Sequence, residues 1–263
     1  MEKNKIFWIT GASSGIGKAL AIFLNDKGYN IILSSRNKEK LDQVKSECLY
    51  PDKAKILVLD LENYHNLQQI VQNAINLFGK IDVLINNGGI SQRSLVKDTN
   101  IQVDEKIMKI NYFGTVALSK AILPHFIQNK NGHFVTVTSV VGKIGTPLRS
   151  SYAASKHALH GFFDSLRAEV YKDNIKVTLI CPGFVQTNVS INALIGDGSS
   201  QNTMDKATAN GLKPNFVAKK IHQAILKNKE EVVIGGKKEK FSVLLKRFYP
   251  KLLSKLVRKI SVT

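Results

Sequence analysis

Short apolar runs alternate with longer segments of helical periodicity along most of this 263-residue chain, and this alternation limits the fold more than any other feature. The runs that we expect to form strands are Ile6–Thr10, Asn30–Ser34, Ile56–Asp60, Val83–Asn86, His133–Thr138, Val177–Cys181 and Val232–Ile234. The segments that we expect to form helices are Gly15–Lys27, Lys38–Glu47, Tyr64–Phe78, Asp104–Gln128, Ser151–Tyr171 and Asn215–Lys227. Most strand runs are continuously apolar, which is typical of parallel strands covered on both faces. The sequence therefore predicts an α/β fold with one doubly wound, seven-stranded parallel sheet and helices on both faces.

No repeat, low-complexity tract or linker divides the alternating region, so we expect a single domain over residues 1–236. Two segments fall outside the alternation. Ser190–Gly211 is rich in Asn, Gly and Ser, and loops of this length tend to be functional, so residues 188–213 are predicted to form a substrate loop. Residues 237–263 form a basic tail that needs an explanation of its own.

A glycine-rich turn follows the first predicted strand and opens the first predicted helix. It contains Gly11, Ser13, Ser14, Gly15, Ile16 and Gly17, with glycines in the spacing G-x-x-x-G-x-G. Glycines let the backbone turn sharply and approach a pyrophosphate, which is held by the free N–H groups at the helix N-terminus. Placed between a first strand and a first helix, this turn predicts a dinucleotide site in a Rossmann-type domain.

The end of the second predicted strand indicates which dinucleotide binds. The run after Leu33 is Ser34, Ser35, Arg36 and Asn37, and it lacks the acid that would hold a ribose 2′-hydroxyl. Arg36 can instead pair with a 2′-phosphate through charge-assisted hydrogen bonds. We therefore expect Ser35 and Arg36 to contact the cofactor, and the cofactor to be NADP(H).

Tyr152 and Lys156 are four residues apart in a predicted helix, which places a phenol and an ammonium on one helical face. A nearby cation favours the ionised phenol and can lower a tyrosine pKa from about 10 toward the working pH. A tyrosine tuned in this way can exchange a proton with an alcohol or a carbonyl oxygen. Arg149, three residues earlier, could contact an acidic substrate, but we expect it on the surface.

Several motifs in one order make the chain resemble the short-chain dehydrogenase/reductase family. The matching landmarks are Thr10–Gly17, Asp60-Leu61, Asn86-Asn87-Gly88-Gly89, Asn111, Thr138-Ser139, Tyr152 with Lys156, and Pro182-Gly183 with Thr187. Within the family the chain is similar to the hydroxysteroid-dehydrogenase-like branch that includes dehydrogenase/reductase members 7 and 7B. The stretch from Tyr152 through Asn188, the region around Asp197 and the basic tail carry that closer likeness.

The resemblance implies a role for each matching residue. Tyr152 is expected to protonate the carbonyl oxygen, Lys156 to lower the Tyr152 pKa and bind the nicotinamide ribose, and Ser139 to polarise the carbonyl. Asn111 would hold a water that links Lys156 to solvent. Asp60 is expected near the adenine, Asn87 near the adenosine ribose, and Pro182, Gly183, Val185 and Thr187 around the nicotinamide. Leu61 and Gly88 are also implied to contact the cofactor.

Two positions depart from the family pattern. Family members usually have alanine where this chain has Gly88, so we expect a looser turn beside the cofactor. Thr138 stands where a second serine is common, and we expect its hydroxyl to serve equally well.

Composition restricts the setting. No apolar run approaches 18 residues, and the first strand begins near Lys5, so we expect neither a membrane span nor a signal peptide. Cys48 and Cys181 lack metal or redox spacing and are expected to pack as small hydrophobes in a reducing cytoplasm. No metal site is expected, because His157 and His160 have no evident third ligand.

The basic tail holds nine Lys or Arg against one acid, Glu239, a net +8 of the chain's +18. Apolar stripes on either side of Pro250 predict two short amphipathic helices. The stripe residues are Phe241, Leu244, Leu245, Phe248, Tyr249, Leu252, Leu253, Leu256, Val257 and Ile260. These faces could dock on the enzyme's own core or on a second subunit, or make peripheral contact with an anionic membrane. No nucleic-acid binding is expected, because no recognised motif accompanies the charge.

Taken together, these features predict an NADPH-dependent oxidoreductase that interconverts a small-molecule carbonyl and an alcohol. The branch resemblance implies a hydrophobic carbonyl substrate, and the family resemblance implies a homodimer or homotetramer. One alternative is a 3-ketoacyl-carrier-protein reductase, to which a basic surface is suited. An alternative of another class is a non-catalytic NADP(H) sensor, although such proteins typically lose the tyrosine or lysine that this chain keeps.

Overall fold

Seven parallel strands form one sheet in the computed structural model, which describes residues 4–258. The strands are β1 (Ile6–Thr10), β2 (Asn30–Ser34), β3 (Ala54–Ile56), β4 (Val83–Asn86), β5 (Gly132–Val137), β6 (Ile175–Pro182) and β7 (Glu231–Ile234). Their order is β3-β2-β1-β4-β5-β6-β7, so the chain reverses its direction of winding between β1 and β4. This is the predicted doubly wound arrangement, and ligands of such sheets bind beyond the carboxyl ends of the strands at that reversal.

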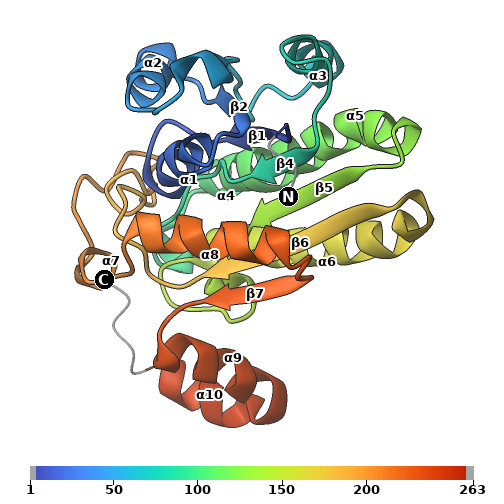
Figure 1. Ribbon diagram of the computed structural model, residues 1–263. Coiled ribbons are helices and arrows are strands. Elements are labelled where there is room, and N and C mark those ends of the chain that lie inside the picture. Colours follow the sequence, from blue (N-terminus) through green and yellow to red (C-terminus); the bar gives the residue numbers. More distant parts are fainter. Residues whose placement is uncertain (1–3, 259–263) are drawn as a thin grey trace.

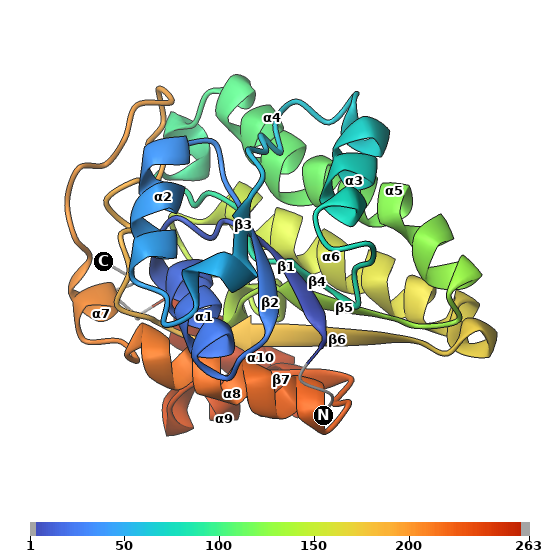
Figure 2. The same ribbon diagram turned by 45° about the horizontal axis from the view of Figure 1, so that its top comes forward.

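Helices cover both faces of the sheet (Figures 1 and 2). On one face lie α1 (Gly15–Asp26), α2 (Lys38–Ser46) and α8 (Pro214–Leu226), and on the other α3 (Leu67–Asn76), α4 (Ile101–Met108), α5 (Thr115–Gln128) and α6 (Ser150–Glu169). Each face has its own core. Leu20 of α1 and Ile221 of α8 pack on the first, whereas Ile122 of α5 and Phe163 of α6 pack on the second. Two-sided coverage explains why the strands are apolar at successive positions.

The third strand differs from its predicted position. It spans Ala54–Ile56, where we expected Ile56–Asp60. Its partner β2 ends at Ser34, so the regular ladder stops at the pair of Leu33 and Ile56. The chain continues beside β2 through hydrogen bonds from Leu57 N–H to Leu33 and from Leu59 N–H to Ser35, but without forming a strand.

The predicted helix Asp104–Gln128 is also wrong in one respect, because a π-helical turn at Lys109–Gly114 separates α4 from α5. Gly114 packs directly on the backbone of Leu61, and a Cβ at this position would overlap the Leu61 carbonyl oxygen. The wider turn lies where the helix approaches the loop that follows β3. Such turns are rare in proteins overall, but those that occur are often found at functional sites.

The tail forms a helical hairpin, α9 (Lys237–Phe248) and α10 (Pro250–Val257), that breaks at Pro250 as predicted. The hairpin packs beside β7 at the edge of the sheet (Figure 1). Leu245 and Leu253 are buried there against Val140 and Ile144. Lys259 and Ile260 of the predicted tail lie outside the described residues. Within residues 4–258, no helix combines the length and apolarity needed to cross a bilayer.

Candidate active site

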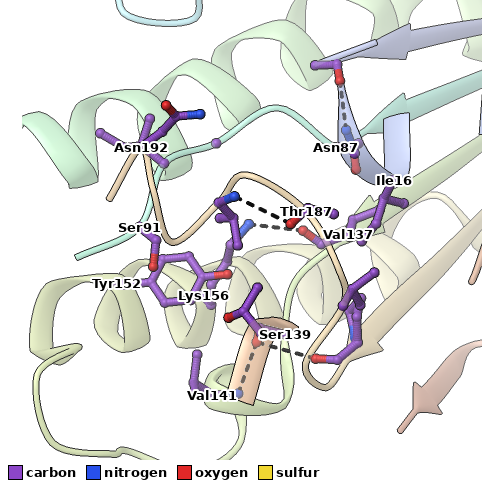
Figure 3. Close-up of a pocket in the computed structure, with 18 of the residues that line it drawn as sticks. Ile16, Asn87, Ser91, Val137, Ser139, Val141, Tyr152, Lys156, Thr187 and Asn192 are labelled. Carbon is purple, nitrogen blue, oxygen red and sulfur yellow. Dashed lines mark hydrogen bonds between the residues drawn. The ribbon is translucent and has the colours of Figure 1, made fainter. Parts of the chain in front are cut away.

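A cleft of about 1330 Å³ opens at the carboxyl ends of the strands. It is lined by every residue that the sequence predicted for catalysis or cofactor binding, except Gly17 and Asn111. Figure 3 shows Tyr152, Lys156 and Ser139 together at one end, with Ile16 and Asn87 at the other. Residues from the whole length of the described chain therefore converge on one cavity.

The glycine turn is built for close approach of a ligand. Gly11 and Gly15 have φ of 63° and 54°, a region that favours glycine. A Cβ at Gly17 would overlap the carbonyl oxygen of Gly11, so Gly17 lets the start of α1 close onto the turn. The residues at the start of α1 line the cleft, and the unpaired N–H groups of a helix N-terminus suit an anionic diphosphate.

Asn87 directly follows β4, which pairs with β1, and its side chain holds the glycine turn in place. Its side-chain amide donates to the carbonyls of Thr10 (3.1 Å) and Gly11 (3.2 Å), while the Thr10 hydroxyl accepts from the N–H groups of Asn87 and Gly88. The Leu61 side chain fills the space beside Gly88, where an added Cβ would lie 2.7 Å from Leu61 Cδ1. The expected looseness at Gly88 is thus offset by Leu61.

Two cations line the end of the cleft beyond β2. Arg36 and Lys40 are both exposed at the start of α2, whose N-cap Asn37 accepts a hydrogen bond from the Lys40 N–H. Lys40 was not predicted from the sequence as a cleft residue. Its spacing of four residues from Arg36, which in a helix places two side chains on the same side, could have indicated it. Asp60 also lines the cleft and accepts a hydrogen bond from the Glu62 N–H.

Lys156 is buried on the catalytic side of the cleft. Its ammonium donates to the Val137 carbonyl at 3.0 Å and lies 5.8 Å from the centre of the Tyr152 ring. Ser139, just after β5, accepts from the Val141 N–H and donates to the Pro182 carbonyl, which fixes its side chain at the cleft wall. The Thr138 hydroxyl is engaged by the protein itself, because it donates to the Ile180 carbonyl of β6 at 3.0 Å and lies 3.1 Å from His160 Nε2.

Burial sets the protonation states of Tyr152 and Lys156. Burial raises the pKa of Tyr152 above 10.0, while a hydrogen bond with Ser139 and the charges of Arg149 and Arg93 work against that rise. Burial lowers the pKa of Lys156 to about 8. Lys156 is not among the causes of the Tyr152 shift, so the expected lowering of the Tyr152 pKa by Lys156 is not found. At neutral pH the Tyr152 phenol therefore keeps its proton, and Lys156 is mainly in its ammonium form.

Asn111 lies in the π-helical turn and is fully buried. Its side-chain amide donates to Ile90 O at 2.9 Å and to the Ser155 hydroxyl at 3.0 Å, and its Oδ1 accepts from the Ile90 N–H at 2.8 Å. Ser155 is one residue before Lys156. Asn111 therefore ties the loop after β4 to the catalytic helix α6 from behind the cleft.

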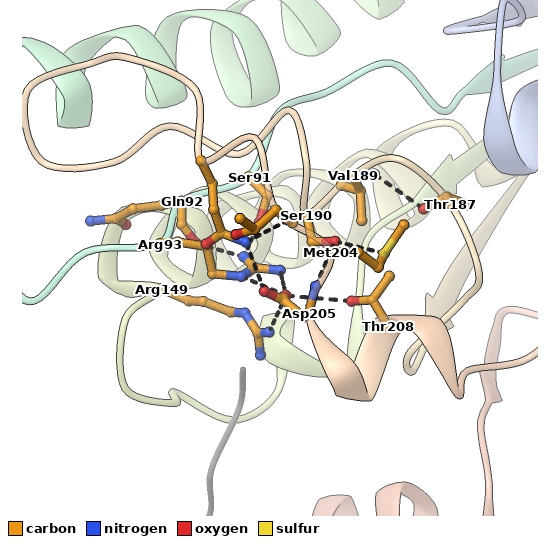
Figure 4. A network of polar contacts seen from close by, with 12 residues as sticks. Ser91, Gln92, Arg93, Arg149, Thr187, Val189, Ser190, Met204, Asp205 and Thr208 are labelled. Carbon is orange, nitrogen blue, oxygen red and sulfur yellow. Dashed lines mark hydrogen bonds and ion pairs between the residues drawn. The ribbon is translucent and has the colours of Figure 1, made fainter.

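A buried polar network borders the site and was missed by the sequence analysis (Figure 4). Arg93 Nη2 lies 2.6 Å from Asp205 Oδ2, and Arg149 Nη2 lies 3.5 Å from the same oxygen. The expectation of a surface position for Arg149 is wrong: only 3% of this residue is exposed, and burial lowers its pKa to about 10. Gln92 Oε1 accepts from the Ser151 N–H at 2.9 Å, which fixes the start of α6 just before Tyr152. Spacing along the chain gives no sign of these contacts.

The predicted substrate loop is held against the loop after β4. Leu194 exchanges backbone hydrogen bonds with Ser91 and Arg93, and Gly196 accepts from the Asn100 N–H. A short helix, α7 (Lys206–Ala209), follows Asp205. These contacts give the loop a defined place above the cleft, which Asn192 and Leu194 help to line.

His160 lies closer to possible ligands than the sequence suggested. One of its ring nitrogens, the Cys181 sulfur and a Glu231 carboxylate oxygen all lie within 4.8 Å of one another. However, Lys143 Nζ lies 2.6 Å from Glu231 Oε2, and burial raises the pKa of Cys181 to about 11. Both effects oppose metal binding, because a metal needs a thiolate and a carboxylate that is not already paired. As expected, both cysteines are buried.

Comparisons with known proteins agree with this architecture. A family model described as "short chain dehydrogenase" matches residues 5–195. The chain is 40% identical to "Dehydrogenase/reductase SDR family protein 7-like" of Drosophila melanogaster over 98% of this chain and 81% of that protein. It is also 40% identical to "Dehydrogenase/reductase SDR family member 7B" of Bos taurus, over 97% of this chain and 81% of that protein. A short-chain dehydrogenase/reductase from Burkholderia phymatum, solved in complex with NAD, superposes with a TM-score of 0.84 at 21% identity, covering 96% of each chain.

Proposed function

The chain belongs to the short-chain dehydrogenase/reductase family, and from that premise we propose that it is an NADP(H)-dependent oxidoreductase that interconverts a carbonyl and an alcohol. The observation that carries the proposal is the meeting of Tyr152, Lys156 and Ser139 in the same cleft as the glycine turn. A nicotinamide cofactor supplies the hydride in such a reaction. The side chains supply the proton and hold the substrate.

In this proposal Tyr152 is the proton donor for carbonyl reduction. Its raised pKa keeps the phenol protonated at neutral pH, as a general acid requires. Ser139 holds the substrate oxygen, since its hydroxyl is fixed at the cleft wall by Val141 and Pro182. The Lys156 ammonium stabilises the phenolate that forms when the proton leaves. Lys156 is itself oriented by its hydrogen bond to Val137.

The cleft fits the proposed cofactor at both ends. The glycine turn and the N-terminus of α1 suit a diphosphate. At the far end, Arg36 and Lys40 suit a 2′-phosphate, because a guanidinium and an ammonium can both donate charge-assisted hydrogen bonds to it. Asp60 follows β3 and does not stand at the end of β2, where an acid would favour the plain ribose.

The proposed substrate is hydrophobic. Beyond Tyr152 the cleft is walled by Val141, Ile144, Phe184 and Leu194, with Val257 contributed by the tail. An apolar wall of this kind accepts an aliphatic or polycyclic carbonyl better than a highly polar one.

The test follows NADPH absorbance with the purified chain and a panel of hydrophobic ketones and aldehydes. We expect carbonyl-dependent oxidation of NADPH, and a 10²- to 10⁴-fold lower rate for Tyr152→Phe with cofactor affinity little changed. The matched control is Tyr112→Phe, a tyrosine outside the cleft lining, which should keep the wild-type rate. A Tyr152→Phe variant as fast as wild type would contradict the mechanism, and NADPH binding without turnover of any carbonyl would favour a sensor.

A further inference from the structure

The tail hairpin buries two leucines and leaves a larger apolar surface uncovered. Leu245 and Leu253 dock on the body of the protein. Six other large apolar residues of the hairpin are between 43% and 66% exposed. These residues are Phe241, Leu244, Phe248, Tyr249, Leu252 and Leu256, and they are called the hairpin surface below. Docking on the enzyme core therefore explains only part of the apolar pattern of the tail.

The hairpin surface is organised by helical spacing. Phe241, Leu244 and Phe248 of α9 follow i, i+3, i+7, and Leu252 and Leu256 of α10 follow i, i+4, so each helix carries one exposed apolar stripe. The two helices pack against each other beside β7 (Figure 1). Scattered exposed hydrophobes need no explanation, but apolar residues aligned along two packed helices indicate an interaction surface.

The charges around these stripes have one sign. The exposed cations are Lys237, Lys238, Lys240, Lys246, Arg247, Lys251, Lys255 and Arg258. The only acid among the described hairpin residues is Glu239, which is partly buried against Gly235 and Gly236. By helical position, Lys240 and Arg247 flank the α9 stripe, and Lys251 and Lys255 flank the α10 stripe. Apolar side chains bordered by Lys and Arg suit the boundary between acyl chains and anionic headgroups.

We propose that the hairpin surface is an interfacial anchor that binds a membrane containing anionic lipid. The charge pattern favours lipid over a second copy of this chain. In a twofold interface the same patch faces itself, which would bring these cations together across the contact. An anionic lipid surface instead complements every one of them.

The anchor also lies next to the cleft. Ser242 and Glu239 of α9 and Val257 of α10 line the cavity that holds Tyr152. Membrane binding does not depend on the proposed function, because it requires neither cofactor nor turnover and can be measured without either.

The experiment sediments the full chain with phosphatidylcholine vesicles prepared with and without phosphatidylserine, in the absence of cofactor. We expect the protein to pellet with the anionic vesicles and to be released by salt, because exposed charges are screened at high ionic strength. The variant Phe241→Ser/Phe248→Ser should weaken binding at least about tenfold, since it removes two large apolar side chains from the interface. Its control, Tyr171→Ser, removes an aromatic ring that is even more open to solvent but lies after α6, and it should bind as wild type does.

A second pair of variants tests the charge. Lys251→Glu/Lys255→Glu should also weaken binding about tenfold or more. The control Lys172→Glu/Lys176→Glu makes the same charge change around the start of β6 and should have little effect. All substituted side chains are exposed, so circular dichroism should report a native fold for each variant.

Three outcomes would overturn the proposal. The first is a wild-type chain that does not pellet with anionic vesicles. The second is undiminished pelleting of Phe241→Ser/Phe248→Ser, which would mean attraction by charge alone. The third is a chain that sediments in the ultracentrifuge as an oligomer, becomes monomeric in that variant and pellets with neither kind of vesicle, which would assign the hairpin surface to a second copy.

Discussion

Arg93 and Asp205 form a buried ion pair in which Nη2 and Oδ2 lie 2.6 Å apart, although 112 residues separate them in the chain. Arg93 follows β4 and Asp205 precedes α7, so the pair ties the substrate loop to the core of the site. Both side chains are at least 96% buried. Breaking a buried pair leaves a buried charge without its counter-charge.

Asp205→Asn should therefore destabilise the protein and loosen the loop. We expect a loss of about 3 kcal/mol in the free energy of unfolding, because the Arg93 guanidinium stays buried without its carboxylate. Residues 188–213 should become more sensitive to limited proteolysis, and the KM for a carbonyl substrate should rise more than that for the cofactor. Urea unfolding and protease digestion measure the first two effects.

The control for this variant is Asp164→Asn, which removes a carboxylate 2.7 Å from Arg167 on the surface of α6. Exposed pairs contribute about 1 kcal/mol or less, so its unfolding should barely change. Equal losses in the two variants would show that burial does not set the strength of the Arg93 contact.

Two glycines should respond to alanine with opposite signs. Gly17→Ala places a methyl group on the Gly11 carbonyl, so the turn must open; we expect lower stability and at least tenfold weaker binding of NADPH. Gly161→Ala, in the middle of α6 with open space around the position, should instead raise the free energy of unfolding by about 0.5–1 kcal/mol. Thermal unfolding and fluorescence titration with NADPH test both variants, and weaker NADPH binding in Gly161→Ala would count against this account.

The strands were predictable because burial on two faces leaves a signal in consecutive residues. β1, β2 and β4 have the predicted limits, and each lies inside the sheet with neighbours on both sides. β3 is an edge strand of three residues, and its register depends on where β2 ends rather than on its own composition. The local sequence pattern therefore could not predict the residue at which β3 begins.

The cleft residues were predictable for a different reason: their motifs occur at fixed places between strands and helices. The network around Arg149 was not, because a buried arginine looks like a surface arginine until its partner is known. Asp205 is 56 residues further along the chain, in a loop without periodicity. The π-helical turn at Lys109–Gly114 was hidden for a similar reason, since its apolar residues keep helical spacing closely enough to read as one helix.

The charge at Arg36 should decide the cofactor. Arg36→Asp removes a donor to the 2′-phosphate and adds an acceptor for a 2′-hydroxyl, so the NADPH/NADH ratio of kcat/KM should fall at least tenfold. The control is Lys38→Asp, which makes the same change of charge two residues away, where the side chain pairs with Asp42 and does not line the cleft. Its ratio should stay close to wild type. An unchanged ratio in Arg36→Asp would remove the case for NADP(H).

His133 should make the protein sensitive to acid. It is buried in β5 beside Thr178, and burial lowers its pKa to about 3 from the ordinary 6.5. Between these values the unfolded chain binds a proton that the folded chain does not, so stability is complete above about pH 6.5 and falls as the pH drops toward 3. At pH 5 this amounts to about 2 kcal/mol. His133→Gln keeps a donor for Thr178 but cannot titrate. The fall in its free energy of unfolding from pH 7.5 to pH 5, measured in urea, should therefore be about 2 kcal/mol smaller than that of wild type. Equal falls in the two proteins would mean that His133 is not the group that titrates.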